Sequence, residues 1–399
     1  MEIFEKAYIG SCELSNRIIR SATFEGMANK EGIPTEDYVS LYKKLSQNNI
    51  GAIITGFVFI SKEGKAMQPG QAGINSVDYI PVYKRITDEV HRNNGKIFLQ
   101  LAHTGRQTRK KDTGEEVVGV SGKKSIYFKS KTRVLSTKEI YQIIEKFGDS
   151  ANYARQAGFD GIQIHAAHGY LIHQFMLPHL NMRKDIFGIE KGKKIGTKFL
   201  DLVINNIRQK CGEEFPILVK VSGSDDFRRK FTKAQFTNLI KFLDSKTVDA
   251  IEVSYGTMDY AMNIFRGDVP VDLILAKNDI YRTDNKFRKK FLKTLYFPIV
   301  KTKFFGFSPM YNLNFARLAK RNTNIPIITV GGFREKKEIE YAIQKENIDF
   351  VSLCRAIICE PDFVNKLMAN NNYRSKCVNC NYCAIMCDTE NVTKCYKHG

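Results

Sequence analysis

Short apolar runs recur along the chain and predict eight β-strands. Most of them are continuous instead of alternating with polar residues, which is typical of strands that are buried on both faces of a sheet. The predicted strands are Ile18 to Ala22, Ala52 to Gly56, Ile97 to Leu101, Gly161 to His165, Ile217 to Val221, Ala250 to Val253, Ile327 to Val330 and Phe350 to Leu353.

Segments with a helical period separate these runs, and a strand followed by a helix is the repeating unit of a (β/α)8 barrel. The alternative, a doubly wound open sheet, is disfavoured because no Gly-x-Gly-x-x-Gly motif follows any predicted strand. We therefore predict an α/β fold, a single (β/α)8 TIM barrel whose active site lies at the carboxyl ends of the strands. The predicted helices are Thr35 to Asn49, Ile80 to Asn94, Thr137 to Gly158, Lys198 to Cys211, Thr232 to Ser245, Asn312 to Arg321 and Lys336 to Glu346.

Two connections are too long to be simple loops. One follows the third strand, from Leu101 to Thr137, and the other follows the sixth strand, from Ser254 to Asn312. We expect both to lie over the barrel mouth as lids or substrate walls. Residues 1–370 are predicted to form the barrel, and residues 371–399 a Cys-rich C-terminal extension.

The composition is that of a folded protein, because 43% of the 399 residues are hydrophobic, which excludes intrinsic disorder. The longest apolar stretch, Gly51 to Ile60, is about half as long as a membrane span of roughly 20 residues. The start of the chain carries Glu2, Glu5 and Lys6 where a signal peptide would be apolar. We therefore expect a soluble, cytoplasmic protein with no membrane partner.

The chain carries 62 Lys and Arg against 42 Asp and Glu, a net charge of +20. The excess gathers in Arg106 to Lys111, Lys191 to Lys194 and Arg282 to Lys303. None of these segments belongs to a nucleic-acid-binding motif, so we expect no nucleic-acid partner. They are either solvated surfaces or, for the two on the long rim connections, an attraction for an anionic substrate such as a carboxylate or a CoA thioester.

Four of the seven histidines fall between Ile164 and His179. His165 ends a predicted strand, and His168 and Tyr170 follow in a loop, so the three side chains can converge on one ligand. Two imidazoles can donate hydrogen bonds to an oxyanion or a carbonyl, and a phenol can supply a proton. A zinc site is a weaker alternative, because the stretch has no carboxylate or thiolate to complete a ligand set. The other alternative is a set of core histidines with satisfied hydrogen bonds.

These histidines belong to a longer motif. The stretch from Ala157 to Phe175, with Asn181, Arg183 and Asp185 after it, resembles the signature of the Old Yellow Enzyme family of FMN-dependent NAD(P)H:flavin oxidoreductases. The resemblance covers essentially the whole chain. Its other landmarks, in family order, are Asn16 to Ile18, Gln100 to Arg106, Val330 to Gly332, and Asp349 to Val351 with Arg355.

The resemblance implies an enzyme that reduces activated C=C bonds. In such enzymes a hydride passes from NAD(P)H to FMN and then to the alkene. By the resemblance, His165 and His168 hold the substrate's carbonyl or another electron-withdrawing oxygen, and Tyr170 protonates the α-carbon. Physical chemistry agrees with this division, because hydrogen-bond donors belong on the oxygen that gains charge and the weak acid on the carbon that gains a proton.

The resemblance also implies flavin-binding residues. Gln100 would contact the pyrimidine edge through its amide, and Lys220 stands where family members usually place an Arg near flavin N1 and O2. Gly56 would allow close approach of the backbone. Ala22 and Thr23 would border the ring, and Gly331, Gly332 and Arg355 would bind the FMN phosphate.

The sequence departs from the family pattern at three places. Phe24 stands where many members have a Thr or Cys that tunes the flavin potential. Cys354 replaces the Gly that usually precedes the phosphate-binding Arg. After Asp185, the family's Gly-rich run is replaced by Phe187 to Lys194.

Five of the nine cysteines, Cys377, Cys380, Cys383, Cys387 and Cys395, lie in the last 23 residues. Cys377, Cys380, Cys383 and Cys395 resemble the cluster motif of the dienoyl-CoA reductase and trimethylamine dehydrogenase branch of the family, where it holds a [4Fe–4S] cluster. Four thiolates also suit tetrahedral zinc, and no metal at all is a third alternative. Cys387 could replace Cys395 as the fourth ligand.

That branch usually has a further C-terminal nucleotide-binding region, and the sequence ends at Gly399 without one. The resemblance leaves two alternatives. In the first, NAD(P)H reduces FMN directly and small activated alkenes, some of them anionic, are the substrates. In the second, a flavin and iron–sulfur dehydrogenase or dienoyl-CoA reductase-like enzyme exchanges electrons with a partner protein through the cluster. A homo-oligomer is compatible with either.

Overall fold

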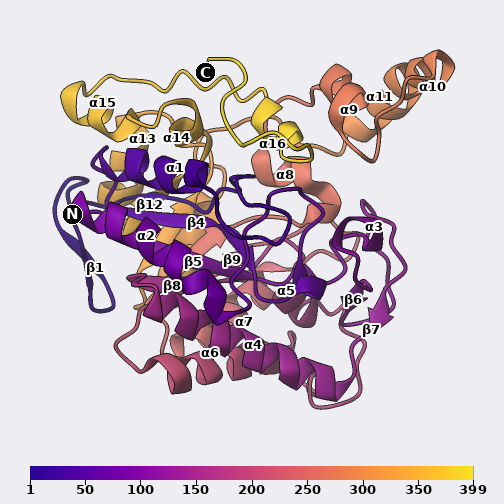
Figure 1. The fold of residues 1–399 in the computed structure, drawn as a ribbon, viewed down its shortest axis with the longest axis horizontal. Coiled ribbons are helices and arrows are strands. Elements are labelled where there is room, and N and C mark those ends of the chain that lie inside the picture. The colour runs from indigo at the N-terminus through magenta and orange to yellow at the C-terminus, as the bar shows by residue number, and fades with distance from the viewer. Residues whose placement is uncertain (399) are drawn as a thin grey trace.

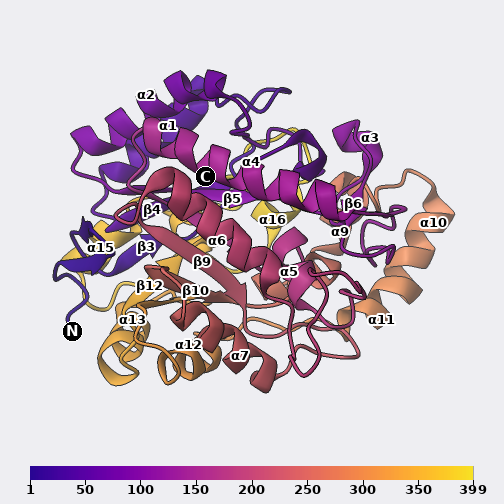
Figure 2. The ribbon, with the colours of Figure 1, turned by 90° about the horizontal axis from the view of Figure 1, so that it is seen from below.

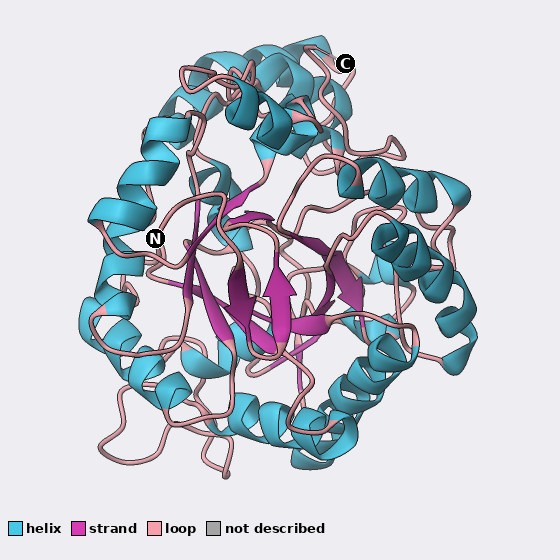
Figure 3. Cartoon of the chain, turned by 90° about the vertical axis from the view of Figure 1, so that its left-hand side faces the viewer, coloured by secondary structure: helices cyan, strands magenta, loops and turns pink. Residues whose placement is uncertain are grey.

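The computed structural model describes residues 1–398 and contains a closed barrel of parallel strands. The barrel order is β10-β11-β12-β3-β4-β5-β8-β9, and Figure 3 shows the strands enclosed by helices. All eight predicted strands are confirmed, as is the (β/α)8 fold. The strands are β3 (Ile18–Arg20), β4 (Ala52–Phe59), β5 (Ile97–Ala102), β8 (Gly161–Ala166), β9 (Ile217–Ser222), β10 (Ala250–Ser254), β11 (Ile327–Val330) and β12 (Phe350–Leu353).

Helices on the outside connect successive strands (Figures 1 and 2). All seven predicted helices are confirmed, and the last of them is a short α-helix followed by a π-helical turn, η5. Capping boxes explain two of the starts, at Ser136 with Glu139 and at Thr232 with Gln235. The outer helices are α1 (Glu36–Ser46), α2 (Ile80–Arg92), α4 (Thr137–Gln156), α6 (Lys198–Cys211), α7 (Lys233–Asp244), α12 (Leu313–Lys320), α13 (Lys336–Glu340) with η5 (Tyr341–Lys345), and α15 (Phe363–Ala369).

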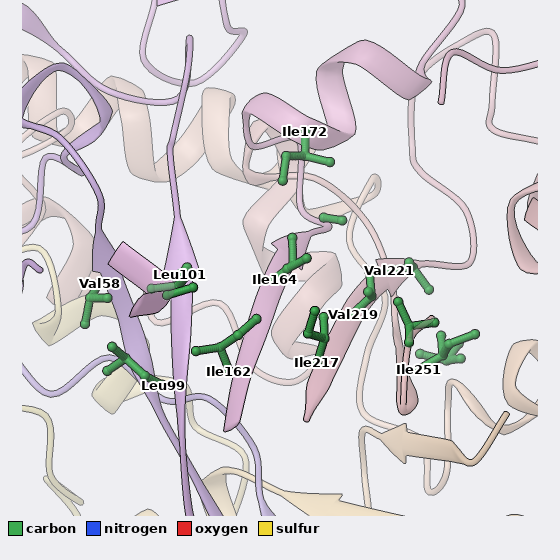
Figure 4. Close-up of a cluster of buried hydrophobic side chains, with 14 of the residues drawn as sticks. Val58, Leu99, Leu101, Ile162, Ile164, Ile172, Ile217, Val219, Val221 and Ile251 are labelled. Atoms are coloured by element: carbon green, nitrogen blue, oxygen red, sulfur yellow. The ribbon is translucent and has the colours of Figure 1, made fainter. Parts of the chain in front are cut away.

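The barrel strands are buried on both faces. Along a strand, successive side chains point to opposite faces, so each strand has an outward and an inward set. The outward set packs against the helices and forms the main core (Figure 4). Ile217, Val219 and Val221 of β9 belong to it, whereas Leu218 between them belongs to a separate inner cluster.

An antiparallel hairpin closes the amino-terminal end of the barrel. It consists of β1 (Ala7–Ile9) and β2 (Cys12–Leu14). Ile9 and Leu14 are fully buried and belong to the same apolar cluster as Phe98, Leu218 and Phe350, which lie inside the barrel. The barrel therefore has an apolar floor, and polar side chains are free to occupy the opposite, carboxyl end.

Both predicted long connections carry small elements of their own at the carboxyl end. The connection after β5 contains α3 (Lys110–Thr113) and the parallel pair β6 (Val118–Gly119) and β7 (Arg133–Val134), and α5 (Leu171–Met176) follows β8. The connection after β10 contains η3 (Met258–Tyr260), α8 (Ala261–Phe265), α9 (Val271–Lys277), α10 (Lys286–Phe291), η4 (Leu292–Tyr296) and α11 (Phe297–Lys301). Figure 1 shows α9 to α11 extending away from the barrel.

The C-terminal part of the chain returns to this rim. β12 leads into α14 (Arg355–Cys359), and after α15 the chain forms α16 (Tyr382–Met386), which packs against α9. None of the helices within residues 1–398 is long and apolar enough to cross a membrane.

Candidate active site at the carboxyl end of the barrel

A chain of polar side chains crosses the barrel interior above the apolar floor. Gln100 Nε2 of β5 donates to Gln163 Oε1 of β8 at 2.6 Å, and Gln163 Nε2 donates to Glu252 Oε2 of β10 at 2.8 Å. Lys220 Nζ of β9 lies 3.2 Å from the same carboxylate oxygen. All four side chains are nearly inaccessible to solvent. The polar layer therefore links four neighbouring strands.

Glu252 accepts further hydrogen bonds that satisfy its second oxygen. Ser21 Oγ and Ser352 Oγ each donate to Oε1 at 2.7 Å, and Lys220 Nζ also donates to Ser21 at 3.0 Å. Burial alone would raise the pKa of Glu252, but Lys220 and the hydroxyl donors hold this pKa below its usual range. Glu252 is therefore ionised, and it holds the Lys220 side chain in a fixed position beneath the rim.

Gln163 and Glu252 are not among the residues that the sequence predicts for the site. Each is a single polar residue between apolar neighbours, in Ile162-Gln163-Ile164 and Ile251-Glu252-Val253. That alternation indicates a strand position that faces a polar interior. Interpreting each run as uniformly apolar overlooks its single polar residue.

The structure brings the predicted residues His165, His168 and Tyr170 together. The ring centroids of His165 and Tyr170 lie 4.6 Å apart, and those of His165 and His168 lie 5.0 Å apart. After β8 the chain turns sharply, because His168 and Gly169 adopt left-handed backbone conformations with φ of +59° and +76°. Two serines fix the turn: Ser222 Oγ accepts from the His168 backbone N–H at 3.1 Å, and His168 Nε2 lies 2.8 Å from Ser254 Oγ.

Burial sets the protonation of these three groups. It lowers the pKa of both imidazoles well below the usual range, and the nearby Lys220 cation lowers both further. The two histidines are therefore neutral at neutral pH. His165 Nδ1 accepts the Ala167 N–H at 3.4 Å, which leaves the proton on Nε2 as a donor. Burial, and then Asp388, raises the pKa of Tyr170, so its phenol keeps its proton.

These side chains line one cavity of about 440 Å³ at the rim. Phe24 and Phe57 add an aromatic wall, and the Phe57 ring centroid lies 5.5 Å from that of Tyr170. Phe57 was not predicted as a site residue; it reaches the cavity because β4 is irregular between Ile54 and Phe57 and continues past Gly56. The predicted flavin-binding residues that line the cavity are Ala22, Thr23, Gln100, Lys220 and Arg355.

The three predicted glycines do not line this cavity. The Gly56 N–H donates to the buried Glu25 carboxylate at 2.6 Å, and a Cβ at Gly56 would lie 2.1 Å from Glu25 Oε2. At Gly331, a Cβ would lie 2.4 Å from the Tyr311 ring, and at Gly332 it would lie 2.6 Å from a backbone oxygen of the neighbouring segment. Their positions are explained by close packing against these neighbours.

Asp388, in the C-terminal part of the chain, also lines the cavity and was not predicted. Its carboxylate accepts from Gln68 Nε2 at 2.9 Å, from Tyr127 OH at 3.3 Å and from Asn278 Nδ2. Burial raises the pKa of Asp388 to about 6. No local pattern identifies this residue, because its neighbours come from three distant segments.

The four predicted metal-binding cysteines, Cys377, Cys380, Cys383 and Cys395, line a second, much smaller cavity. Cys359 of α14 lines it too and was not predicted; burial and the neighbouring Cys395 raise the pKa of its thiol to about 12. Within residues 1–398, no three Cys, His, Asp or Glu side chains are arranged closely enough to hold a metal ion. The four predicted cysteines therefore line one cavity but do not lie close enough together to form a metal site. The predicted metal cluster is not confirmed.

The alternative fourth cysteine, Cys387, lies elsewhere. It lines the large cavity, and its thiol donates to the Cys383 carbonyl at 3.2 Å. Cys383 and Arg355 line both cavities, so the two are neighbours. Arg355 Nη1 also donates to Asn381 Oδ1 at 2.7 Å, which ties the barrel to the cysteine segment.

The basic cluster Arg106 to Lys111 is largely neutralised. Arg106 is buried, and its Nη2 lies 2.7 Å from Asp259. Arg109 pairs with Asp112 at 2.5 Å and with Asp279 at 2.6 Å. The charges of these two arginines therefore hold the rim connections together, and the attraction of this cluster for an anionic substrate stays a prediction.

Comparisons with known proteins identify the family and the fold of the chain. The profile of the NADH:flavin oxidoreductase / NADH oxidase family matches residues 2–267. The chain is 28% identical over 381 residues to an NADH oxidase of Thermoanaerobacter brockii, covering 95% of this chain and 52% of that protein. It is 26% identical over 389 residues to a cinnamate reductase of Clostridium sporogenes, covering 95% and 54%. The chain thus spans about half the length of these relatives. A 2-naphthoyl-CoA reductase structure has the same fold, with a TM-score of 0.81, 18% identity and coverage of 98% of this chain and 56% of that one.

His173 supports the loop that carries His168 and Tyr170, because its Nδ1 accepts the Gly169 N–H at 2.9 Å. We expect His173→Leu, which leaves that N–H unpaired, to be less stable than His173→Asn by about 1–2 kcal/mol. The Asn oxygen can replace Nδ1 as the acceptor, so it is the matched control. Urea denaturation measures both, and equal stability of the two variants would show that the hydrogen bond contributes nothing.

His173 also predicts a pH dependence. Burial lowers its pKa to about 3, so the unfolded chain takes up a proton near pH 6.5 while the folded chain does not. The wild type should therefore lose stability relative to His173→Asn as the pH falls below about 6.5. At pH 5 the loss should be about 2 kcal/mol. Urea denaturation of both proteins at pH 7 and pH 5 checks this, and a constant difference would contradict it.

Proposed function

Because the chain belongs to the NADH:flavin oxidoreductase / NADH oxidase family, we propose that it reduces electron-poor C=C bonds with NAD(P)H, using FMN bound at the carboxyl end of the barrel. The family match agrees with the resemblance that the sequence motifs indicate. The observation that carries the proposal is the convergence of His165, His168 and Tyr170 in the cavity that Gln100 and Lys220 also line.

The cavity suits a flavin at its inner end. Gln100 offers an amide, and Lys220 offers a cation held in place by Glu252, which together match the donors and acceptors of a pyrimidine edge. Ala22 and Thr23 would border the ring, and Arg355 would face the phosphate. When bound, FMN supplies hydride exchange between NAD(P)H and the alkene. Gly331 and Gly332 would offer backbone groups to the phosphate. A side chain at Gly331 would clash with the Tyr311 ring.

The histidines would orient the substrate. His165 offers its Nε2–H to the oxygen of a carbonyl or another electron-withdrawing group, and this bond strengthens as negative charge develops there. When Ser254 donates to His168 Nε2, the neutral His168 ring carries its proton on Nδ1 and offers this N–H to the substrate as a second donor. Because both imidazoles are neutral, they polarise the substrate oxygen without transferring a proton to it.

Tyr170 would supply the proton to the α-carbon. Its phenol is protonated over the whole physiological pH range, and it lies beside the His165 ring. Much of the remaining cavity wall is apolar and aromatic, which excludes water from the reacting carbon. The residues of this outer wall include Ile274, Tyr281, Phe297, Val300 and Phe304.

The substrate class follows from the same wall. An apolar lining with two oxygen-binding donors suits an α,β-unsaturated carbonyl compound or carboxylate with a bulky apolar substituent. The similarity to a cinnamate reductase supports this class. Lys129 and Lys303 line the cavity and would attract a carboxylate.

A second candidate function involves the cysteines. Their cavity shares Arg355, Ile358 and Cys383 with the large cavity, so a [4Fe–4S] cluster there would lie next to the flavin site. Such a cluster would exchange electrons with a partner protein and make the enzyme a dehydrogenase or a dienoyl-CoA reductase-like protein. Thiols with a raised pKa would have to lose their protons when a metal binds.

We expect Tyr170→Phe to slow alkene reduction by roughly 100-fold or more, because general acid catalysis contributes on this order. Reduction of the bound flavin by NAD(P)H should be unchanged, since it needs no proton from Tyr170. Stopped-flow measurement of the two half-reactions with a substituted cinnamate separates them. Tyr281→Phe, which removes a phenol from the outer wall, is the control. Loss of both half-reactions in Tyr170→Phe would show that Tyr170 holds the flavin instead.

For the cysteines, we expect anaerobically reconstituted protein to contain iron and sulfide. Cys395→Ser should lower the iron content, because Cys395 lines the cysteine cavity, and Cys387→Ser should leave it unchanged, because Cys387 lines the flavin cavity. Metal analysis and the visible spectrum measure this. Wild-type protein without iron would rule out the cluster and leave the first function in place.

A further inference from the structure

The run from α10 through η4 to α11 carries an unexplained apolar stripe. The three elements follow one another without a break from Lys286 to Lys301. Four large apolar side chains of this run are exposed to solvent, whereas exposed apolar side chains on a soluble protein are normally scattered singly. These are Phe287 at 88%, Phe291 at 55%, Leu295 at 57% and Ile299 at 66%. We call residues 286–301 the basic amphipathic segment.

The spacing places these four side chains along one side. They recur at every fourth residue, and positions four apart advance by only about 40° around an α-helix. The π-helical turn η4, which lies between Phe291 and Phe297, takes more residues per turn and so reduces this drift. The stripe is therefore a continuous apolar edge along the segment.

The fold already accounts for the opposite side of the segment. Leu292 and Phe297 are buried at 8% and 3% exposure and form a small core with Ile274, Leu275 and Ile385. None of the stripe residues belongs to this core, and α10 has no buried residue. Figures 1 and 2 show α10 projecting away from the barrel, so the stripe is not needed to hold the segment in place.

The charges around the stripe are of one sign and mostly unpaired. From residue 282 to residue 303 the chain has eight Lys or Arg and one Asp. Four of the six residues of α10 are basic, Lys286, Arg288, Lys289 and Lys290. In the described part of the chain, none of these four lies within salt-bridge distance of a carboxylate; Lys293 is the member of the segment that pairs, with Asp272 at 2.8 Å.

We propose that the basic amphipathic segment binds the surface of an anionic lipid membrane. Its apolar stripe would enter the boundary between headgroups and acyl chains, and its cations would contact the headgroups. Large apolar side chains in a line, flanked by Lys and Arg, are the features of helices that lie in a membrane interface. An acidic protein would satisfy the charges but would need a matching apolar groove. The expectation of no membrane partner depends on the lack of a membrane-spanning apolar stretch, a criterion that a helix lying in the interface does not have to meet.

One consequence rests on the proposed function. Tyr296, Phe297 and Val300 of the segment also line the large cavity, so its outer wall would lie next to the bilayer. Apolar substrates that partition into lipid would then have a short path to the cavity. Turnover of alkenes dissolved in the lipid tests this consequence, whereas membrane binding itself is measured without any substrate.

The test uses the purified full-length protein and vesicles of phosphatidylcholine with or without phosphatidylglycerol. We expect sedimentation with the anionic vesicles, weakening as salt is added, and little with the neutral ones. The sequence contains no Trp, so Phe287→Trp gives a single fluorescent reporter in the stripe. Its emission should shift to the blue with anionic vesicles. Tyr8→Trp, at an exposed site on the hairpin at the other end of the barrel, should not shift.

Two sets of variants separate the stripe from the charge. Phe287→Gln with Phe291→Gln should lower the vesicle partition coefficient about tenfold or more. Lys286→Glu, Lys289→Glu and Lys290→Glu together should lower it by at least about fivefold for each charge removed. Controls at exposed sites elsewhere are Val77→Gln with Met368→Gln, and Lys191→Glu, Lys193→Glu and Lys194→Glu together.

Two results would overturn the proposal. In the first, wild-type protein does not bind anionic vesicles at low salt. In the second, the protein forms dimers that the Phe287→Gln and Phe291→Gln pair disrupts while vesicle binding stays the same, which would assign the stripe to a second copy of the chain. Because all substituted positions are exposed, an unchanged melting temperature should show that the variants still fold.

Discussion

The ion pair between Lys220 and Glu252 is the constraint on which the rest of the barrel interior depends. Two charges inside a protein are costly to desolvate unless their remaining hydrogen bonds are satisfied. Here Gln163, Ser21 and Ser352 complete the shell around the carboxylate. These partners come from β8, β12 and the segment after β3, on both sides of the barrel, so the pair is satisfied only when the barrel is closed. Closing the barrel and satisfying the buried ion pair therefore occur together.

The fixed cation also determines what the rim can do. It helps keep His165 and His168 neutral, which in the proposed function makes them hydrogen-bond donors and leaves proton transfer to Tyr170. The apolar floor beneath, sealed by the β1–β2 hairpin, keeps polar groups at one end of the barrel. Chemistry can then take place only where the strand ends, the long connections and the C-terminal segment meet, in the cavity that also contains Asp388.

Sequence periodicity was enough to predict the barrel, because each buried strand and each amphipathic helix is defined by its own residues. The trio His165, His168 and Tyr170 could also be predicted, since one short stretch contains all three. Asp388 and Phe57 could not, because a tertiary contact and a strand irregularity bring them to the cavity. Gly331 and Gly332 were expected from their motif to bind the FMN phosphate, and only the structure shows how closely their neighbours pack against them.

The net charge of +20 does not by itself locate a binding surface. What distinguishes the basic side chains is whether each one is paired with a carboxylate. Arg106 is an arginine like Arg288 of the segment 286–301, yet burial and an ion pair with Asp259 make it part of the framework. Among residues 1–398, the basic side chains of α10 have no such partner, and they flank apolar side chains that the fold leaves in water. Exposed apolar side chains are unfavourable in water, and the crowded Lys and Arg side chains beside them repel one another. A surface that is both anionic and apolar relieves both at once, and this is the physical reason to separate that segment from the rest of the basic surface.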